Sequence, residues 1–254
     1  MKIEFDKERF ALLSERSLLD EKKDFGIGTL GEKAVHQTVK SYIEPRPECR
    51  ERKAFGFVAD ILNEKGIFEV QTRSFEKLPK KIKKALPECS VTVVYPLIRE
   101  KKICWLSPDT GEIAEIKKSP KHEYPCDALA ELSKIAEYIG KENFSVCLMF
   151  ISAEEYRLLD GWDESRKKRA TKYNIYPIEL LEILEIKNDS DLHQLIPENL
   201  PEIFEAKDFY KRISRKGRGA FYALKFMVDK GIFVQVGKRS NAKIYCPSGK
   251  AFKR

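Results

Sequence analysis

This sequence of 254 residues lacks several features that mark whole classes of protein. It has no apolar run close to the ~20 residues that a membrane-spanning helix needs, and residues 1–6 lack the apolar stretch of a signal peptide. Its six cysteines include no C-x-x-C pair, which argues against a tetrathiolate zinc site and a disulfide framework. We therefore expect a cytoplasmic protein with reduced thiols and no membrane partner.

Familiar catalytic motifs are also absent from the sequence. There is no P-loop, no G-x-S-x-G motif and no dinucleotide fingerprint. The glycines of Gly26-Ile27-Gly28 precede a predicted helix, but they follow no predicted strand, so they fail the test for a dinucleotide-binding loop. Any chemistry must therefore rest on other residues.

Positive charge is in excess, but it is unevenly distributed along the sequence. The net charge is +8, and hydrophobic residues make up 42% of the chain, enough for a folded core. Residues 204–254 hold 14 Lys and Arg against 3 Asp and Glu, a net of +11, which leaves −3 for residues 1–203. A basic end of this kind is typical of proteins that bind nucleic acid. A solubilising tail is the alternative interpretation.

A short hairpin carries the most informative polar residues. Residues 58–62 and 67–72 alternate as strands, and Asn63-Glu64-Lys65-Gly66 between them is typical of a turn. This hairpin brings Asp60 beside Glu69. Two carboxylates among apolar neighbours are costly to keep ionised. Because hard divalent cations prefer oxygen ligands, the pair predicts a cation site.

The flanking pattern predicts a defined order of elements. A helix begins at Thr29-Leu30-Gly31-Glu32, which matches a capping box, and ends before Pro45. The elements expected after it are strands at 50–56, 57–62 and 67–74, a basic helix at 77–86, a buried strand at 91–95, a hairpin at 103–116, a helix at 127–139 and a strand at 143–151.

Helix, three strands, helix, strand is an order that resembles the PD-(D/E)XK nuclease superfamily, the restriction-endonuclease-like fold. The resemblance covers about residues 29–96 and implies an α/β αβββαβ core with a mixed sheet. It implies that Asp60, Glu69 and the Val70 carbonyl bind Mg²⁺ or Mn²⁺. Glu32 resembles the first-helix glutamate of Holliday-junction resolvase-like members, which adds a further ligand.

Gln71 departs from the family pattern, which has a lysine at this position. A glutamine side chain hydrogen-bonds a water but supplies no positive charge. Arg73 shares a face with Glu69 and Gln71 if the strand runs that far, and its guanidinium suits a phosphate. An ion pair with a carboxylate is the alternative role for Arg73. His36, one turn after Glu32, is either at this site or a packing residue.

Each predicted acid also has a structural explanation. Glu32 is the N3 residue of the capping box, which requires no catalysis. A structural salt bridge to Arg73 or Arg52 is the alternative explanation for both Asp60 and Glu69. Asp60 is harder than Glu32 to explain without a functional role, because strands disfavour Asp and its burial is costly, and Glu69 between Phe68 and Val70 is similar.

The basic end has a pattern of its own. We expect a helix at 206–213, a second helix capped by Ser214 and closed at Gly231, and a hairpin at 232–245 with a basic tip. With a first helix near 189–195, this resembles a winged-helix domain. The resemblance implies that α-helical and hairpin residues contact DNA, namely Arg215, Lys216, Arg218, Tyr222, Lys225, Lys238 and Arg239. Winged helices also mediate protein contacts, which is the alternative.

These patterns predict four segments. They are an N-terminal helical arm (1–28), a nuclease-like α/β domain (29–155), a connecting helical and basic segment (156–200) and a winged-helix domain (201–254). The predicted function is metal-dependent endonuclease cleavage of double-stranded or branched DNA, with a homodimer compatible with cutting both strands. The alternative is a catalytically inactive, nuclease-fold DNA-binding protein or transcriptional regulator.

Overall fold

A computed structural model describes residues 3–22, 33–107, 109–159, 171–214 and 216–249. Helices and strands are interspersed along these residues, so the predicted α/β class is confirmed. The chain forms two compact units, each built from separate stretches of sequence. The sheet unit is made of Met1–Thr72, Val93–Glu123 and Cys147–Leu184, and the C-terminal unit is made of Arg73–Thr92, Tyr124–Val146 and Glu185–Arg254.

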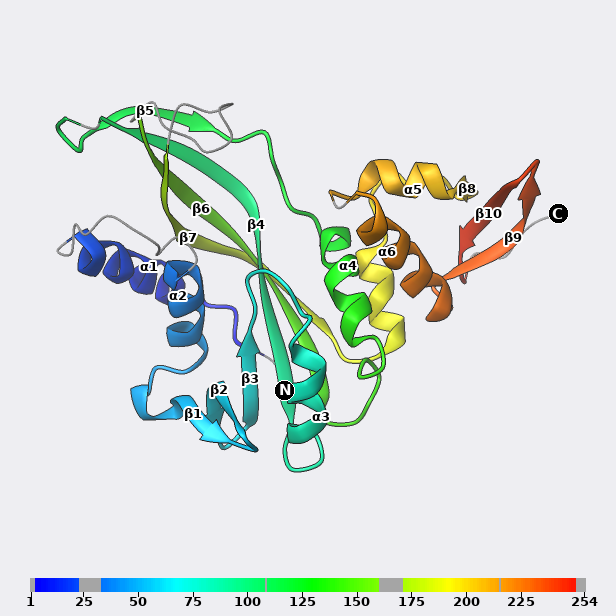
Figure 1. Ribbon diagram of the computed structural model, residues 1–254, viewed down its shortest axis with the longest axis horizontal. Helices are drawn as coiled ribbons and strands as arrows, with labels where there is room; N and C mark the ends of the chain where they lie inside the picture. Colours follow the sequence, from blue (N-terminus) through cyan, green and yellow to red (C-terminus); the bar gives the residue numbers. More distant parts are fainter. Residues whose placement is uncertain (1–2, 23–32, 108, 160–170, 215, 250–254) are drawn as a thin grey trace. The chain divides into compact units, whose positions relative to one another are not determined.

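A mixed sheet dominates the sheet unit, and its long central strands run side by side in Figure 1. Its strand order is β1-β2-β3-β4-β6-β7, with β5 paired to β4. The pairs β1/β2, β2/β3 and β4/β5 are antiparallel. The strands are β1 (Arg50–Ala54), β2 (Phe57–Asn63), β3 (Gly66–Val70), β4 (Val91–Leu106), β5 (Ile113–Lys118), β6 (Phe144–Leu158) and β7 (Thr171–Ile186).

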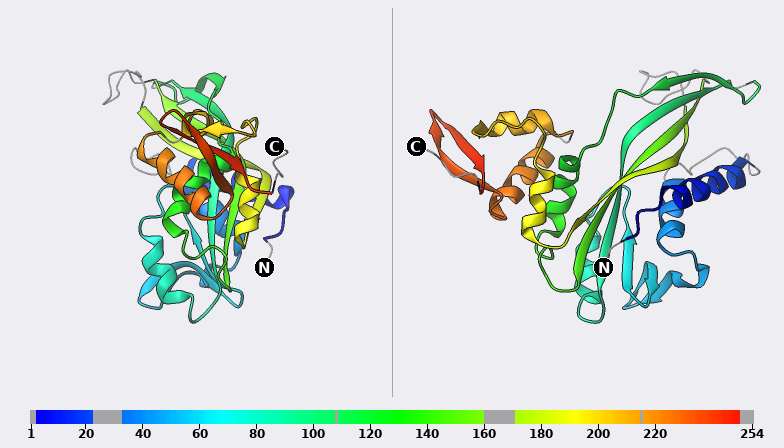
Figure 2. Two further views of the ribbon diagram at one scale, coloured as in Figure 1. Left: turned by 90° about the vertical axis from the view of Figure 1, so that its right-hand side faces the viewer. Right: turned by 180° about the vertical axis from the view of Figure 1, so that it is seen from behind.

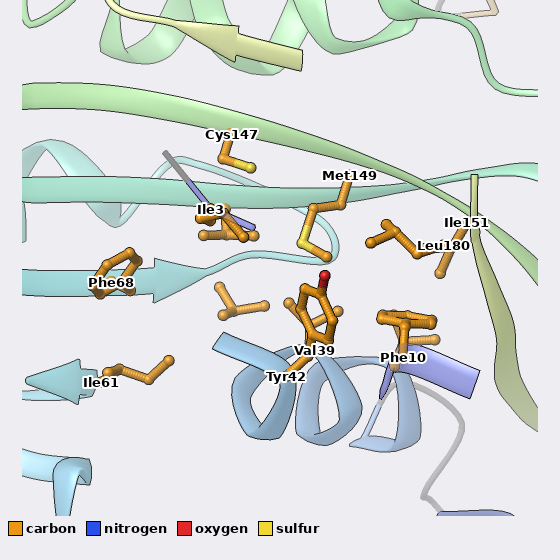
Figure 3. Packing of buried hydrophobic residues seen from close by; sticks show 13 residues of the cluster. Ile3, Phe10, Val39, Tyr42, Ile61, Phe68, Cys147, Met149, Ile151 and Leu180 are labelled. Carbon is orange, nitrogen blue, oxygen red and sulfur yellow. The ribbon is translucent and has the colours of Figure 1, made fainter. Parts of the chain in front are cut away.

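Two helices, α1 (Lys7–Lys22) and α2 (Lys33–Ile43), pack beside this sheet, as the right-hand view of Figure 2 shows. The apolar side of α2 faces the strands, and Val39 and Tyr42 lie opposite Met149 of β6 in Figure 3. The Tyr42 ring meets that of Phe10 edge-on, with centroids 5.3 Å apart. Burying apolar side chains from helices and strands together fixes α2 against the hairpin formed by β2 and β3.

The C-terminal unit contains helical segments and a small sheet. Its three strands have the order β8-β10-β9, and α6 buries Ala223, Leu224 and Met227. Gly231, just beyond α6, has φ 69°, a conformation that glycine adopts without strain. The elements are α3 (Leu78–Ala85), α4 (Leu129–Leu132), β8 (Phe204–Glu205), α5 (Ala206–Arg212), α6 (Arg218–Asp229), β9 (Phe233–Arg239), β10 (Ala242–Pro247) and the 3₁₀ segments η1 (Pro47–Cys49, in the sheet unit), η2 (Pro125–Ala128), η3 (Ser133–Ile135) and η4 (Asp189–Leu195).

Several local predictions are confirmed and others are wrong. The hairpin at β2 and β3 forms, but β3 ends at Val70, short of the predicted 67–74. The helix predicted at 127–139 is broken into η2, α4 and η3. The connecting segment at 156–200, predicted as helical, contains the strand β7. These residues form a strand because they pair with β6 as the last strand in the sheet order. Ser214 does not cap α6, whose N-cap is Gly217.

Two predictions concern disulfides and membrane-spanning helices in the residues that the structure describes. All six cysteines lie among these residues, and none is part of a disulfide. Of the helices that the structure describes, none combines the length and apolar character needed to span a membrane.

Candidate functional site

The Asp60 carboxylate of β2 hydrogen-bonds the backbone of β3 at the end of the hairpin opposite its turn. The ladder pairs Asn63 with Gly66 and Ile61 with Phe68. Just beyond this last pair, Asp60 Oδ2 accepts a hydrogen bond of 2.8 Å from the backbone N–H of Val70. The carboxylate thus lies directly against Val70, whose N–H it satisfies. A charged acceptor makes this bond stronger than a neutral one.

His36 of α2 joins this pair from the neighbouring helix. Its Nε2 lies 3.1 Å from the carbonyl oxygen of Val70 and 3.4 Å from Asp60 Oδ2. Since Val35 and Val39 are buried in the core, the packing of α2 places His36 over the hairpin end. A carboxylate, a backbone carbonyl and an imidazole therefore converge at one point, and both side chains are partly exposed to solvent.

Lys40, one turn beyond His36, lies beside a second carboxylate that sequence patterns did not single out. Its side chain is only 2% exposed, and Nζ donates a 2.7 Å hydrogen bond to Glu51 Oε1. Glu51 is 63% exposed and has φ 53°. The Lys40 hydrogen bond lowers the pKa of Glu51, the charge of Asp60 opposes that shift, and His36 adds to it.

Glu51 and Asp60 are neighbours across β1 and β2. Arg50 pairs with Ile61 and Arg52 pairs with Ala59, so Glu51 stands opposite Asp60 in that register. On the other side, the pairing of Ile61 with Phe68 brings Asp60 and Glu69 to adjacent positions of β2 and β3. In the sequence, His36 and Lys40 are four residues apart on the predicted helix and therefore share one face. This spacing is the signal that could have placed Lys40 near the site together with His36.

The remaining predicted site residues are distributed as follows. Glu69 lies on β3 and is 1% exposed. Gln71 lies beyond the strand and its backbone N–H bonds Val94 of β4. Arg73 lies in a bend past the end of β3, so the strand does not run as far as Arg73 and the condition for a face shared with Glu69 is not met. Glu32, with Thr29 of the capping box, lies outside the described residues.

The donor set suits a hard cation in its chemistry, since Asp60 and the Val70 carbonyl both offer oxygen. Among the residues that the structure describes, no three His, Cys, Asp or Glu side chains are grouped to hold a metal ion. The described part of the site thus supplies the partly exposed carboxylate of Asp60 beside Val70. A second carboxylate, that of Glu51, lies across the β1–β2 pair.

The predicted DNA-contacting residues mostly lie on exposed positions of the C-terminal unit. Lys216, ahead of α6, donates to the carbonyls of Tyr210 and Ile213 at 3.0 and 2.9 Å, so it stabilises the α5–α6 connection. Arg218, Tyr222 and Lys225 are exposed on α6, and Lys238 and Arg239 are exposed at the end of β9. Lys225 is ion-paired with Asp229, and Arg215 lies outside the described residues.

Comparison with known proteins gives a family whose matched residues include every strand of the seven-stranded sheet. Residues 33–187 match a family described as "Domain of unknown function (DUF8091)". The chain belongs to this family. The matched residues begin with α2 and end with β7, so the DUF8091 domain contains both the sheet and the cluster around Asp60.

A relative with the name "Uncharacterized protein", from Treponema pallidum (strain Nichols), is 31% identical over 222 residues, which cover 86% of each chain. The aligned stretch is longer than the DUF8091 domain, so the similarity extends beyond it. No solved structure matches this chain.

Proposed function

We propose that this protein is a metal-dependent DNA endonuclease whose hydrolytic site lies at Asp60 and whose C-terminal unit binds DNA. One observation carries the proposal. The Asp60 carboxylate lies against Val70 at the end of a hairpin, within the order α2-β1-β2-β3-α3-β4. This order resembles the PD-(D/E)XK core, in which the same hairpin positions carry the metal ligands.

In this proposal Asp60 and the Val70 carbonyl hold Mg²⁺ or Mn²⁺, with Glu69 and Glu32 as the further ligands that the resemblance implies. When bound, the ion supplies a water of lowered pKa and positive charge at the phosphate. Gln71 hydrogen-bonds a water without adding charge. His36 holds the Val70 carbonyl in place, since its Nε2 lies within hydrogen-bonding distance of that oxygen.

Lys40 and Glu51 complete the electrostatics of this proposed site. Lys40 fixes the exposed Glu51 carboxylate by a 2.7 Å hydrogen bond, across the strand pair from Asp60. Two neighbouring carboxylates repel each other, and a cation relieves that repulsion. In the proposal, Lys40 offsets the charge of Glu51, and a bound cation would offset the charge of Asp60.

For DNA binding, the proposal rests on the topology of the C-terminal unit. The chain order β8-α5-α6-β9-β10 with the sheet order β8-β10-β9 resembles a winged helix, and η4 precedes it at Asp189–Leu195. In that arrangement α6 faces the DNA and the β9–β10 turn contacts the backbone. The +11 charge of residues 204–254 suits a polyanion.

Cleavage with a matched pair of variants tests the proposal. We expect Mg²⁺- or Mn²⁺-dependent cleavage of duplex or branched DNA, reduced by about 100-fold or more in Asp60→Asn, because a metal ion supplies several kcal/mol of transition-state stabilisation. Asp109→Asn makes the same charge change at an exposed position and should cleave normally. Circular dichroism checks that both variants fold. A chain that cleaves no single-stranded, duplex or branched DNA with either ion would falsify the proposal.

A second function is favoured by Gln71 and by the absence, among the described residues, of a three-residue metal group. In this alternative the protein is a DNA-binding regulator with a nuclease-like fold that has lost its chemistry. Calorimetric titration with Mn²⁺ separates the two. Binding heat that disappears in Glu69→Ala supports the nuclease, whereas no heat together with intact DNA binding supports the regulator.

A further inference from the structure

The exposed side of α6 carries a continuous stripe of two cations and two aromatic rings. The stripe consists of Arg218, Phe221, Tyr222 and Lys225, spaced as i, i+3, i+4 and i+7, so these side chains share one face of the helix. Phe221 is 55% exposed and Tyr222 is 52% exposed. We refer to these four residues as the α6 stripe.

The aromatic rings of the stripe are not part of the core. The buried residues of α6, Ala220, Ala223, Leu224, Phe226 and Met227, form its other side. Phe221 and Tyr222 meet each other edge-on, with ring centroids 5.6 Å apart and planes at 71°. Two large adjacent rings left in solvent cost free energy that burial would recover, so they point to a ligand.

The chemistry of the stripe decides which ligand it suits. Base edges in the major groove offer donors, acceptors and the thymine methyl, and a phenyl ring uses only the last of these. The faces of bases are available only where DNA is unpaired, and aromatic side chains stack on them. Arg218 and Lys225 flank the rings, and residues 204–254 of the sequence have a net charge of +11, which suits a phosphate backbone.

We propose that the α6 stripe binds a single-stranded segment of DNA, with Phe221 and Tyr222 stacking on unpaired bases and Arg218 contacting phosphate. Lys225 is ion-paired with Asp229 and exchanges this partner for phosphate on binding. This inference rests on the proposed DNA-binding function and narrows its substrate to DNA that contains an unpaired stretch, such as a fork, flap or branch.

Binding to fluorescent oligonucleotides, measured by anisotropy on the full chain in EDTA, tests this proposal. We expect dT12 and a forked duplex to bind more tightly than a blunt duplex. The double variant Phe221→Ala, Tyr222→Ala should weaken dT12 binding by about 5- to 150-fold per ring, the range that corresponds to about 1–3 kcal/mol of stacking. Alanine is a good helix former, so α6 is retained.

A matched control removes two exposed apolar side chains elsewhere. Ile113→Ala, Ile116→Ala on β5 changes a similar apolar area in the sheet unit and should leave dT12 binding unchanged. Tyr222→Trp, made in the otherwise unmodified chain, should retain stacking and show fluorescence quenching by dT12 beyond that of the unmodified chain.

Three outcomes would overturn the inference. The first is equal binding of dT12 by the Phe221→Ala, Tyr222→Ala variant and the unmodified chain. The second is a preference of the unmodified chain for blunt duplex. The third is a change in sedimentation of the variant with DNA binding unaltered, which would assign the stripe to contact with a second copy. None of these depends on metal or cleavage. Failure here is therefore distinguishable from failure of the nuclease proposal, which is judged by Asp60.

Discussion

The buried ammonium of Lys40 lies 2.7 Å from the exposed carboxylate of Glu51. Lys40 is on α2 and Glu51 is on β1, so one ion pair joins the helix to the edge of the sheet. A buried charge that loses its partner is costly, whereas a buried charge replaced by an apolar group of similar shape costs little. The two residues are therefore expected to respond very differently to substitution.

We predict that Glu51→Gln lowers the free energy of unfolding by about 1–3 kcal/mol, because it leaves the Lys40 ammonium poorly paired. Lys40→Met should cost less than about 1.5 kcal/mol, since the methionine fills the same space without charge. The double variant should match Lys40→Met alone. Urea unfolding at neutral pH measures all three, and a Glu51→Gln variant as stable as the unmodified protein would contradict the prediction.

Acid should destabilise the protein through Glu44. Hydrogen bonds from Arg46, and to a lesser degree from Asn63, lower the pKa of this buried carboxyl from 4.5 to about 2. A folded-state pKa below the unfolded value means that Glu44 contributes stability above about pH 4.5, and that this contribution is lost as pH falls towards 2. Glu44→Gln should therefore flatten the stability profile between pH 5 and pH 2. Equal profiles for variant and parent, measured by urea unfolding at each pH, would contradict this role.

The Asp127 carboxylate should be essential to the C-terminal unit. Its Oδ1 accepts a hydrogen bond of 2.6 Å from the N–H of Ser214, and its Oδ2 accepts one of 2.9 Å from the N–H of Tyr124. Asp127→Ala leaves two partly buried donors without these acceptors, which should cost about 1–3 kcal/mol for each. Chemical denaturation measures the loss. The exposed Asp109→Ala serves as its control and should cost less than about 0.5 kcal/mol.

Local chemistry made much of the fold predictable. The β2–β3 hairpin follows from alternating side chains and a turn that ends in Gly66, whose φ is 108°. The continuous apolar run at Val91–Tyr95 became the buried first part of β4. The order of elements in residues 189–247 was also largely readable, because helix spacing and the basic hairpin are both local patterns.

Pairing between distant segments explains most of what the sequence did not reveal. In the second half of residues 171–186, Glu179, Glu182 and Glu185 recur at every third position among apolar residues, which also fits a helix, and the pairing next to β6 makes the segment β7. The two residues of β8 are too few for any pattern, and they are strand only because Phe204 and Glu205 pair with β10.

The candidate site shows the same limit. Asp60 was identifiable because a carboxylate in an apolar strand requires a partner. His36 was a candidate from its place on the helix after Glu32, and the structure places it beside Asp60. Glu51 comes from the strand across the pair, and no spacing along the chain links it to Asp60. Arg73 was misplaced because strand propensity does not fix where β3 ends, and this strand ends at Val70.

The salt dependence of DNA binding provides a test of the β9–β10 tip. Each phosphate neutralised by a cation contributes about 0.9 to the slope of log affinity against log salt on duplex DNA. If Lys238 and Arg239 each contact one phosphate, Lys238→Gln with Arg239→Gln should reduce that slope by about 1.8. Arg239 also lies 3.6 Å from Glu205, so stability is checked in parallel. Lys102→Gln with Lys118→Gln, at exposed positions of the sheet unit, removes the same charge and should leave the slope unaltered. An identical loss of slope in both pairs would show that net charge, and not the hairpin tip, sets the affinity.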